Sequence, residues 1–485
     1  MKTRIRIAVG ALATLLGACA VGPNYHRPAV PVPAHYQELP GWTPAAPADA
    51  AFKGTWWTAF HDPLLDQLEP QVAVSNQTVA EAYANYQRAL DEVRLARGQL
   101  FPSFGISASV ARSGGSSGSS GAAGFGSTGV TGAGAGSSSQ LTTGSLEGTA
   151  SWTPDLWGQV RRLIEENVAT AQAEKATLAN ATLSEQTLLA TTVIELRFVD
   201  AEIDLQRETV AALRESLRVT QAQAQAGYTN APPSAVVTAQ VALEGAQADL
   251  TGLGVARAQY AHAIAVLVGK NPEELDIPHS KAMPTLPAIP VGLPSTLLER
   301  RPDIAAAERT MAAQNAAIGI AVAAYFPSVS LSAAAGFAQA PLAGLIKTAN
   351  RVWSLGADAS ETVFDFGQRH AEVAAARASY DASVASYRNT VLSAFQSVEN
   401  DLAGLRILAQ QSQQLAVAVS DSIRGTQIAL AEFEAGTVDY TTVAAAQQTQ
   451  VSDQLNALAV EESRLVDAVS LIGDLGGGWS DSQLK

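Results

Sequence analysis

The sequence predicts a mainly α-helical protein with a small β part, built from two internal repeats. A duplicated turn decides this: 209 residues separate Gly227 from Gly436, and each glycine ends a long Ala/Gln/Glu-rich segment without proline. Ahead of each segment lie two stretches in which apolar and small residues alternate, as in a β-hairpin. We therefore expect one module to occur twice, over 64–269 and 301–474.

The N-terminus has the form of a secretory signal. A basic start precedes an apolar run of about ten residues, which is too short to span a bilayer. The run ends in Leu-Gly-Ala before Cys19, which resembles a bacterial lipoprotein box. This resemblance implies a signal peptide over 1–18, acylation of the Cys19 thiol and, because Ala20 is not aspartate, sorting to the outer membrane. An ordinary signal peptide followed by a chance cysteine is the alternative.

The composition excludes several classes of protein. The net charge is −14, and it falls to −17 once Lys2, Arg4 and Arg6 leave with the signal. A chain this acidic is not suited to neutralising phosphates, so nucleic acid is not an expected partner. Cys19 is the only cysteine, which rules out a disulfide framework. No apolar run of 18 residues follows the signal, so no transmembrane helix is expected.

Residues 19–63 are rich in proline and are expected to form an extended, lipidated tether. Near its end, Trp56 and Trp57 are expected to anchor the tether on the helices rather than to bind a ligand. Asp62 before Pro63 is a typical N-cap and first residue of a helix, which we expect over 64–100.

Four strands of about ten residues are expected, in hairpins over 103–152 and 328–362. Along the first strand, Phe104, Ile106 and Val110 alternate with glycine and serine. Strands with one apolar and one small polar face suit a bilayer, but barrels need at least eight strands. We therefore favour a barrel shared between chains; a soluble pair of hairpins packed on helices is the alternative. The Gly/Ser-rich segment 113–139 is expected to be a loop.

Two long helices are expected over 157–226 and 367–435, because apolar residues recur every seven positions in both. At 1.5 Å per residue each would be about 100 Å long. Shorter helices are expected over 233–268 and 438–473, after each glycine turn. A plain coiled-coil stalk would show the same period. The positions are Leu189, Leu196, Ile203, Val210 and Leu217 in the first copy, and Val391, Val398, Leu405, Val419 and Phe433 in the second, where Ser412 and Thr426 occupy the same line.

No catalytic, cofactor or metal site is recognisable, so neither an enzyme nor a cofactor is expected. The six histidines, at 26, 35, 61, 262, 279 and 370, lack metal-site spacing. The glycines at 473–478 are not followed by the Lys-Ser/Thr of a phosphate loop. Neighbouring acids such as Glu165 and Glu166 are typical of solvated helix faces.

A series of motifs, in order and at their spacing, is similar to the lipoprotein (NodT/OprM-like) branch of the TolC outer membrane factors. The resemblance covers essentially the whole mature chain. It implies a homotrimer in which four strands per chain form a twelve-stranded transmembrane β-barrel, continuous with a long periplasmic α-helical barrel. The motifs are Cys19-Ala-Val-Gly22-Pro23-Asn-Tyr25, Trp56-Trp57, Asp62-Pro63, Phe101-Pro102-Ser103, Asp155-Leu-Trp-Gly158, Arg300-Arg301-Pro302-Asp303 and Leu475-Gly-Gly-Gly478-Trp479.

The resemblance also implies a function. Such proteins are passive exit ducts of tripartite efflux pumps that carry drugs and other toxic small molecules from the periplasm to the exterior. Their partners are a periplasmic adaptor protein, an inner-membrane transporter, usually proton-driven and of the RND type, and outer membrane lipid. One alternative is the duct of a type I protein secretion system. Another alternative is a non-transport stalk or adaptor. An adaptor should carry a lipoyl-like domain around its helical hairpin, and the sequence shows no such domain.

In this family the periplasmic end of the helices is pinched shut, which places a candidate gate near Gly227 and Gly436. The family motif after the second turn has a Leu and an Asp that form constriction rings. Here Thr441 stands at the Leu position and Ala445 at the Asp position, so the family's acidic ring cannot be carried over.

Other polar residues at the second turn are therefore the candidates for a replacement ring. Asp439, Tyr440 and Glu434 are the nearest, and Glu432 and Glu434 stand where basic residues often precede the glycine. The alternative is that Asp439 simply caps the next helix.

A Pro-rich equatorial linker over 270–300 joins the two copies, and residues 475–485 form a short tail. Arg300 and Arg301 precede the helix expected to begin at Pro302 and Asp303. We expect these residues to be structural, bonding chain ends and loops near the equator.

Overall fold

The computed structural model describes residues 20–29, 32–33, 35–38, 54–115, 139–229, 231–289, 300–339 and 344–480. The signal and Cys19 lie outside the described residues, and so does the predicted acylation. The chain forms two compact units: Met1–Tyr25, Asp91–Val168 and Ala313–Tyr380 make the first, and His26–Leu90, Ala169–Ala312 and Asp381–Lys485 make the second.

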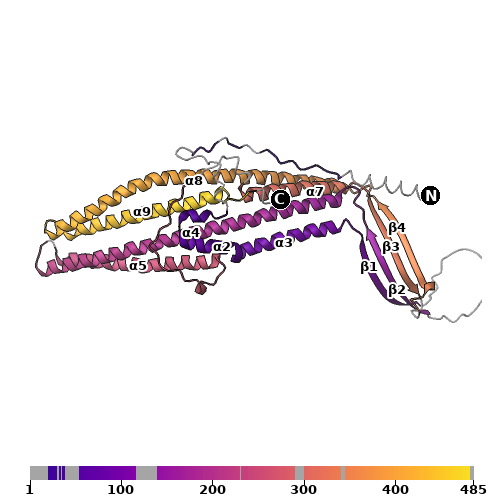
Figure 1. Ribbon diagram of the computed structural model, residues 1–485, viewed down its shortest axis with the longest axis horizontal. Coiled ribbons are helices and arrows are strands. Elements are labelled where there is room, and N and C mark those ends of the chain that lie inside the picture. The colour runs from indigo at the N-terminus through magenta and orange to yellow at the C-terminus, as the bar shows by residue number, and fades with distance from the viewer. Residues whose placement is uncertain are drawn as a thin grey trace, which may run out of the picture. The chain divides into compact units, whose positions relative to one another are not determined.

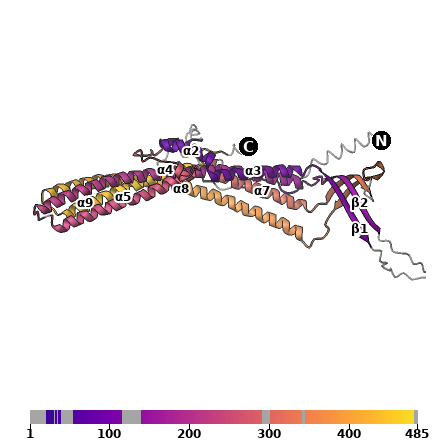
Figure 2. The ribbon, with the colours of Figure 1, turned by 90° about the horizontal axis from the view of Figure 1, so that it is seen from below.

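Two helical hairpins dominate the second unit. The long helices are α4 (Gln159–Gln225) and α8 (Gln368–Glu434), each of 67 residues. Helix α5 (Pro233–Leu267) runs back along α4, and α9 (Tyr440–Asp474) runs back along α8 (Figure 1). The view from below shows the same two pairs (Figure 2). Leu189 and Val398, which are 209 positions apart, are both fully buried, so the seven-residue pattern marks the same packing face in both copies.

The helix expected over 64–100 is wrong as a single helix. It consists of α2 (Pro63–Ser75) and α3 (Gln77–Gly98), separated at Asn76. The Asn76 backbone is extended, and its side chain caps α3 by accepting from Val79 N at 3.1 Å. The same amide donates to Leu267 O and Glu185 Oε2, both at 2.9 Å. At the break, this one side chain caps α3 and also bonds to Leu267 and Glu185 from distant parts of the sequence.

The other helical elements among the described residues are α7 (Pro302–Ala323) and the short 3-10 helices η2 (Trp56–Phe60), η3 (Pro272–Glu274) and η4 (Thr348–Asn350). In the part of the chain that the structure describes, no helix is both long and apolar enough to serve as a membrane span.

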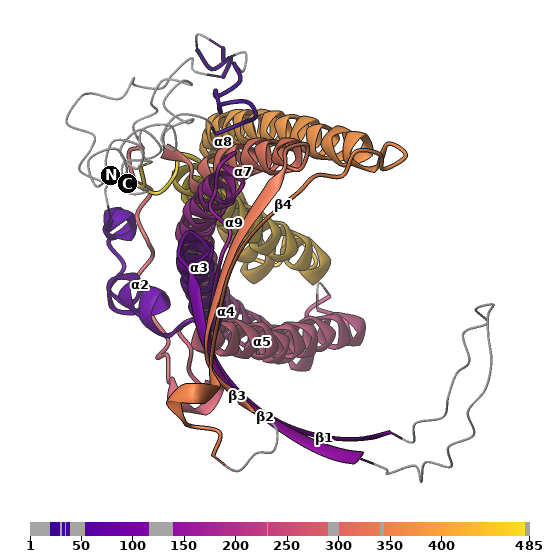
Figure 3. The ribbon, with the colours of Figure 1, turned by 90° about the vertical axis from the view of Figure 1, so that its right-hand side faces the viewer.

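The first unit contains one four-stranded antiparallel sheet in the order β1-β2-β3-β4 (Figure 3). Its strands are β1 (Ser103–Gly115), β2 (Ser139–Trp152), β3 (Ser328–Gln339) and β4 (Arg351–Ser360). The first hairpin has the expected bounds, but its strands, of 13 and 14 residues, are longer than the expected ten because both extend into the Gly/Ser-rich segment. Strands β2 and β3 pair directly, with Leu146 opposite Phe337, so the two hairpins from the two repeats form one sheet.

The register separates the sheet into two chemically different faces. Residues that lie opposite each other share a face, so the pairs Phe104–Ala150, Ala150–Ala333 and Ala333–Leu355 trace one apolar face across all four strands. The other face is rich in serine and threonine. Hydroxyl pairs bridge neighbouring strands on it: Ser103–Ser151 at 2.7 Å, Ser109–Ser145 at 2.8 Å and Ser328–Ser360 at 2.8 Å.

The apolar face of the sheet is uncovered. Phe104 is 80% exposed, Ile106 86% and Trp353 76%. A soluble pair of hairpins would bury such side chains against helices, since burying each one gains about 1.5–3 kcal/mol. The alternative of hairpins packed on helices is therefore wrong for the described sheet.

The core of the second unit surrounds α2 and η2. Trp56 and Trp57 are almost fully buried, with their rings 5.9 Å apart, and they belong to the same cluster as Leu189 and Val398. Next to them, Asp62 caps α2 by accepting from Leu64 N at 2.7 Å. Its other oxygen accepts from Arg197 Nε on α4 at 2.8 Å, so one buried carboxylate both starts α2 and holds it to α4.

Arg301 connects the start of α7 to the end of α9. Its guanidinium contacts Asp303 at 2.7 Å and the Asp474 carboxylate at 2.8 Å, and it also donates to the Asp474 carbonyl. The Arg300 carbonyl lies so close to Gly476 that a Cβ there would approach it to 2.1 Å. Both residues therefore lie against the end of α9, and their structural role stays a prediction.

Candidate functional site at the hairpin tips

Both helical hairpins turn in the same way. Gly227 and Gly436 have φ of 79° and 77°, a left-handed conformation that glycine adopts without strain. After the first helix, Gly227 N donates to Ala224 O and Tyr228 N to Gln223 O. After the second, Gly436 N donates to Phe433 O and Thr437 N to Glu432 O. This double bond pattern is the Schellman motif, which satisfies the last carbonyls of a helix and reverses the chain.

The two tips share one small core. It contains Ala231, Ala235 and Ala239 from the first hairpin, and Ala429, Phe433, Tyr440 and Val443 from the second. The Phe433 and Tyr440 rings meet edge to face, with centroids 5.6 Å apart. Small alanines on one side and aromatic rings on the other allow the tips to pack closely.

This core corrects the expectation for Tyr440. Its side chain is 1% exposed and its hydroxyl has no hydrogen-bond partner among the described residues, so burial raises the pKa of the phenol. A residue buried in this way cannot contribute a polar group to a ring around an open passage. Tyr440 instead stabilises the contact between the tips.

The acidic residues at the second turn are exposed. Asp439 is at the N-cap position of α9, yet its side chain makes no capping hydrogen bond; only its carbonyl accepts, from Thr442 N at 3.0 Å. The alternative that the Asp439 carboxylate caps α9 is therefore wrong. Glu432, Glu434 and Thr441 are exposed as well, so this turn presents three carboxylates to its surroundings.

Two hydrogen bonds join the hairpins just behind the tips. Gln447 Nε2 on α9 donates to Ser216 Oγ on α4 at 2.9 Å. Gln223 Nε2 on α4 donates to the Phe433 carbonyl at 3.5 Å, a weaker bond. We call these two contacts the tip latch. Neither contact was predicted from the sequence, because the bonded residues lie more than 200 positions apart.

A polar cleft of about 190 Å³ lies beside the tip latch, between α4, α8 and α9. Its lining includes Glu208, Gln447, Gln450 and Gln454. The Gln447 Oε1 is buried and has no partner among the described groups. One polar atom of the tip latch therefore lacks a hydrogen bond in the closed arrangement. Opening would expose this oxygen to water, which lowers the free-energy cost of breaking the latch.

A second acidic group lies further along the hairpins. Burial, and then the charges of Glu195 and Glu202, raise the pKa of Glu462 to about 7. Burial also raises the pKa values of Glu195 and Glu202 themselves. Three carboxyl groups from α4 and α9 therefore lie close together, and burial disfavours the charged form of each.

Comparison with known proteins agrees with this architecture. The model of the family described as "Outer membrane efflux protein" matches residues 68–270 and 293–477. The chain belongs to the outer membrane efflux protein family. Its matched residues include most of α2, all of α3, both hairpins and the sheet, whereas η2 and the start of α2 precede the match.

Relatives of this outer membrane efflux protein are named as outer membrane proteins, several of them of efflux pumps. It is 29% identical to "Probable efflux pump outer membrane protein TtgC" of Pseudomonas putida, over 98% of this chain and 96% of the relative. It is 26% identical to the outer membrane protein OprJ of Pseudomonas aeruginosa, over 97% and 95% of the two chains.

Solved structures share the fold. The outer-membrane channel OprN superposes with a TM-score of 0.84 at 29% identity, over 95% of this chain and all of that one. The open state of the MtrE outer membrane channel of Neisseria gonorrhoeae gives a TM-score of 0.80 at 24% identity, over 96% and 99% of the two chains. At that identity the second match shows the fold alone.

Proposed function

We propose that three copies of this chain assemble into the outer membrane exit duct of a tripartite efflux pump. The family and the efflux-pump relatives support this proposal. The observation that carries it is the sheet, with one exposed apolar face and one face of paired hydroxyls. Four strands cannot close a barrel, but twelve from three chains exceed the minimum of about eight.

In this assembly the apolar face meets outer membrane lipid and the serine face meets water. Arg112 and Arg351 share the apolar face, each near the strand end that lies far from the helices. The serine face carries Glu147 and Asp358 and, among the described strand residues, no basic side chain. A water-filled passage lined this way favours cations weakly. The acyl chain on Cys19 would add an anchor to the same membrane.

The duct is passive and has no enzymatic role. The energy for transport comes from an inner-membrane transporter of the RND type, coupled through a periplasmic adaptor. Relatives of this chain are named for antibiotic and toluene efflux, so small toxic molecules are the proposed cargo.

A complementation experiment tests the proposed function. A strain that lacks its own efflux duct, but keeps a matched adaptor and transporter, should regain resistance to antibiotics and toluene when this chain is expressed. Light scattering of the purified protein in detergent should give the mass of a trimer. A monomer that stays in solution without detergent, or unchanged susceptibility with every matched pump, would overturn the proposal.

We also propose that the hairpin tips form the gate of the duct. The tip latch holds the second hairpin against the first, and the exposed acids at the second turn border the opening. Replacing Gln447 by alanine removes the stronger latch bond, which contributes about 1 kcal/mol. The closed-to-open equilibrium should then shift by about fivefold per subunit, and single-channel conductance in planar bilayers should rise.

The same recordings test the acidic residues. Asp439→Ala should reduce the preference for cations, measured as the reversal potential in a salt gradient, without opening the channel. Asp421→Asn on the exposed face of α8 is the matched control and should change neither quantity. If Asp439→Ala left the reversal potential unchanged in a trimer that still assembles, the Asp439 carboxylate would not border the opening.

A further inference from the structure

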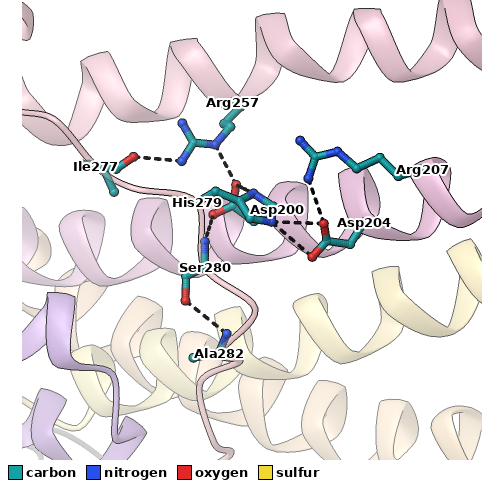
Figure 4. A network of polar contacts seen from close by, with 8 residues as sticks. All are labelled: Asp200, Asp204, Arg207, Arg257, Ile277, His279, Ser280 and Ala282. Atoms are coloured by element: carbon teal, nitrogen blue, oxygen red, sulfur yellow. Dashed lines mark hydrogen bonds and ion pairs between the residues drawn. The ribbon is translucent and has the colours of Figure 1, made fainter.

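The linker between the two repeats is fixed to the first hairpin by one buried carboxylate (Figure 4). The Asp200 side chain on α4 is 0% exposed and accepts three bonds. Arg257 Nε on α5 donates to Oδ1 at 2.7 Å, His279 Nδ1 lies 2.9 Å from the same oxygen, and Ser280 N donates to Oδ2 at 3.1 Å. Arg257 also donates to the Ile277 carbonyl at 2.9 Å, so linker residues 277–280 are held at three points.

His279 contacts a second carboxylate with its other ring nitrogen. Nε2 lies 3.1 Å from both oxygens of Asp204, one helical turn beyond Asp200 on α4. A neutral imidazole has one N–H donor, and only the doubly protonated ring has two. Because both nitrogens face carboxylate oxygens, the geometry fits the doubly protonated ring. A neutral ring would place a lone pair against one of these oxygens.

The charges around the ring come from three elements. Helix α4 supplies Asp200, Asp204 and Arg207, α5 supplies Arg257, and the linker supplies Lys281. The pKa of the Asp204 carboxyl is lowered: burial acts in the opposite direction, but the bond and charge of His279, with Arg207 and Lys281, outweigh it. Asp204 therefore stays ionised over the whole range in which an imidazole titrates.

We propose that His279 is a proton-operated clasp that fastens the inter-repeat linker to α4. While the ring carries both protons, it bridges Asp200 and Asp204 and the clasp is closed. When the ring loses one proton, it releases one of the two carboxylates. Arg257 and the Ser280 amide keep the linker attached, so deprotonation loosens residues 279–282 without detaching them.

Hydrogen exchange of the full-length protein in detergent tests the clasp. The probe is the linker peptide that contains the Ser280 amide, with rates corrected for the intrinsic effect of pH. Because the His279–Asp204 contact is partly exposed, its loss should speed exchange by about three- to fivefold between pH 5.5 and pH 8. His279→Gln should exchange fast at both pH values. His279→Arg, which is charged throughout, should exchange slowly at both.

His262→Gln is the matched control, because His262 is an exposed histidine on the neighbouring α5. It should keep the pH dependence of the unmodified protein. Equal protection of the linker peptide at pH 5.5 and pH 8 would overturn the proposal, and so would an unchanged pH dependence in His279→Gln. Neither outcome depends on the proposed transport function, since the clasp is a property of a single chain.

Discussion

Arg197→Met is expected to lower the stability of the protein by about 3–5 kcal/mol, because it leaves the Asp62 carboxylate charged and buried without a cation. Both partners are almost fully buried, with 7% and 1% of their side chains exposed. Asp62 also caps α2, so the loss should spread to the contact between α2 and α4. The measurement is the apparent Tm of the detergent-solubilised protein at fixed protein concentration.

A double variant separates charge burial from lost packing. Asp62→Asn keeps a capping side chain but removes the charge, so combining it with Arg197→Met should recover a large part of the loss. Arg218→Met is the control, since the Arg218–Glu215 pair on the same helix is exposed, and it should leave the Tm unchanged. An Arg197→Met protein as stable as its parent would mean that Asp62 does not depend on this ion pair.

Glu69→Gln is expected to stabilise the protein at pH 8. Glu69 on α2 is fully buried, and neither carboxylate oxygen has a partner among the described residues. Burial raises the pKa of this carboxyl from 4.5 to about 9. A carboxyl whose pKa is raised on folding holds its proton more tightly in the folded state. The stability that this carboxyl contributes is therefore greatest below pH 4.5 and falls as the pH rises toward 9.

The size of the effect follows from the same shift. Between pH 4.5 and pH 7 the folded protein loses about 3 kcal/mol relative to a neutral isostere. Glutamine has the shape of the protonated acid and does not titrate, so Glu69→Gln should flatten the Tm profile between pH 5 and 8. Glu81→Gln, at an exposed site on α3, should keep the parent profile. A Glu69→Gln protein with the parent's pH slope would show that another group is responsible.

Periodicity in the sequence was sufficient to predict the two long helices and the four strands. The seven-residue period located α4 and α8 to within two residues at each end, because burial on one face of a long helix repeats regularly. Alternation located all four strands and assigned their faces. The break at Asn76 could not be predicted in this way, since its cause is a set of bonds to Leu267 and Glu185 from distant parts of the sequence.

At the candidate gate, the turns could be predicted from the sequence but the contacts between the two hairpins could not. The positions of Gly227 and Gly436 follow from local turn chemistry, which the sequence displays. The burial of Tyr440 depends on packing between two hairpins, and the bond between Ser216 and Gln447 spans 231 positions. The contacts of His279 could not be predicted from the sequence, because its partners lie on a helix about 75 residues earlier. Contacts between distant segments leave no regular trace in composition or spacing.

The paired hydroxyls of the sheet have a consequence for transport. Each serine that bonds to its cross-strand neighbour has fewer hydrogen bonds left to offer a passing solute. In the proposed barrel, the serine face would be hydrated but would bind solutes only weakly, so molecules of different chemistry would pass it with little retention. Such a duct leaves the selection of substrates to the inner-membrane transporter, so that one duct can serve several chemically unrelated substrates.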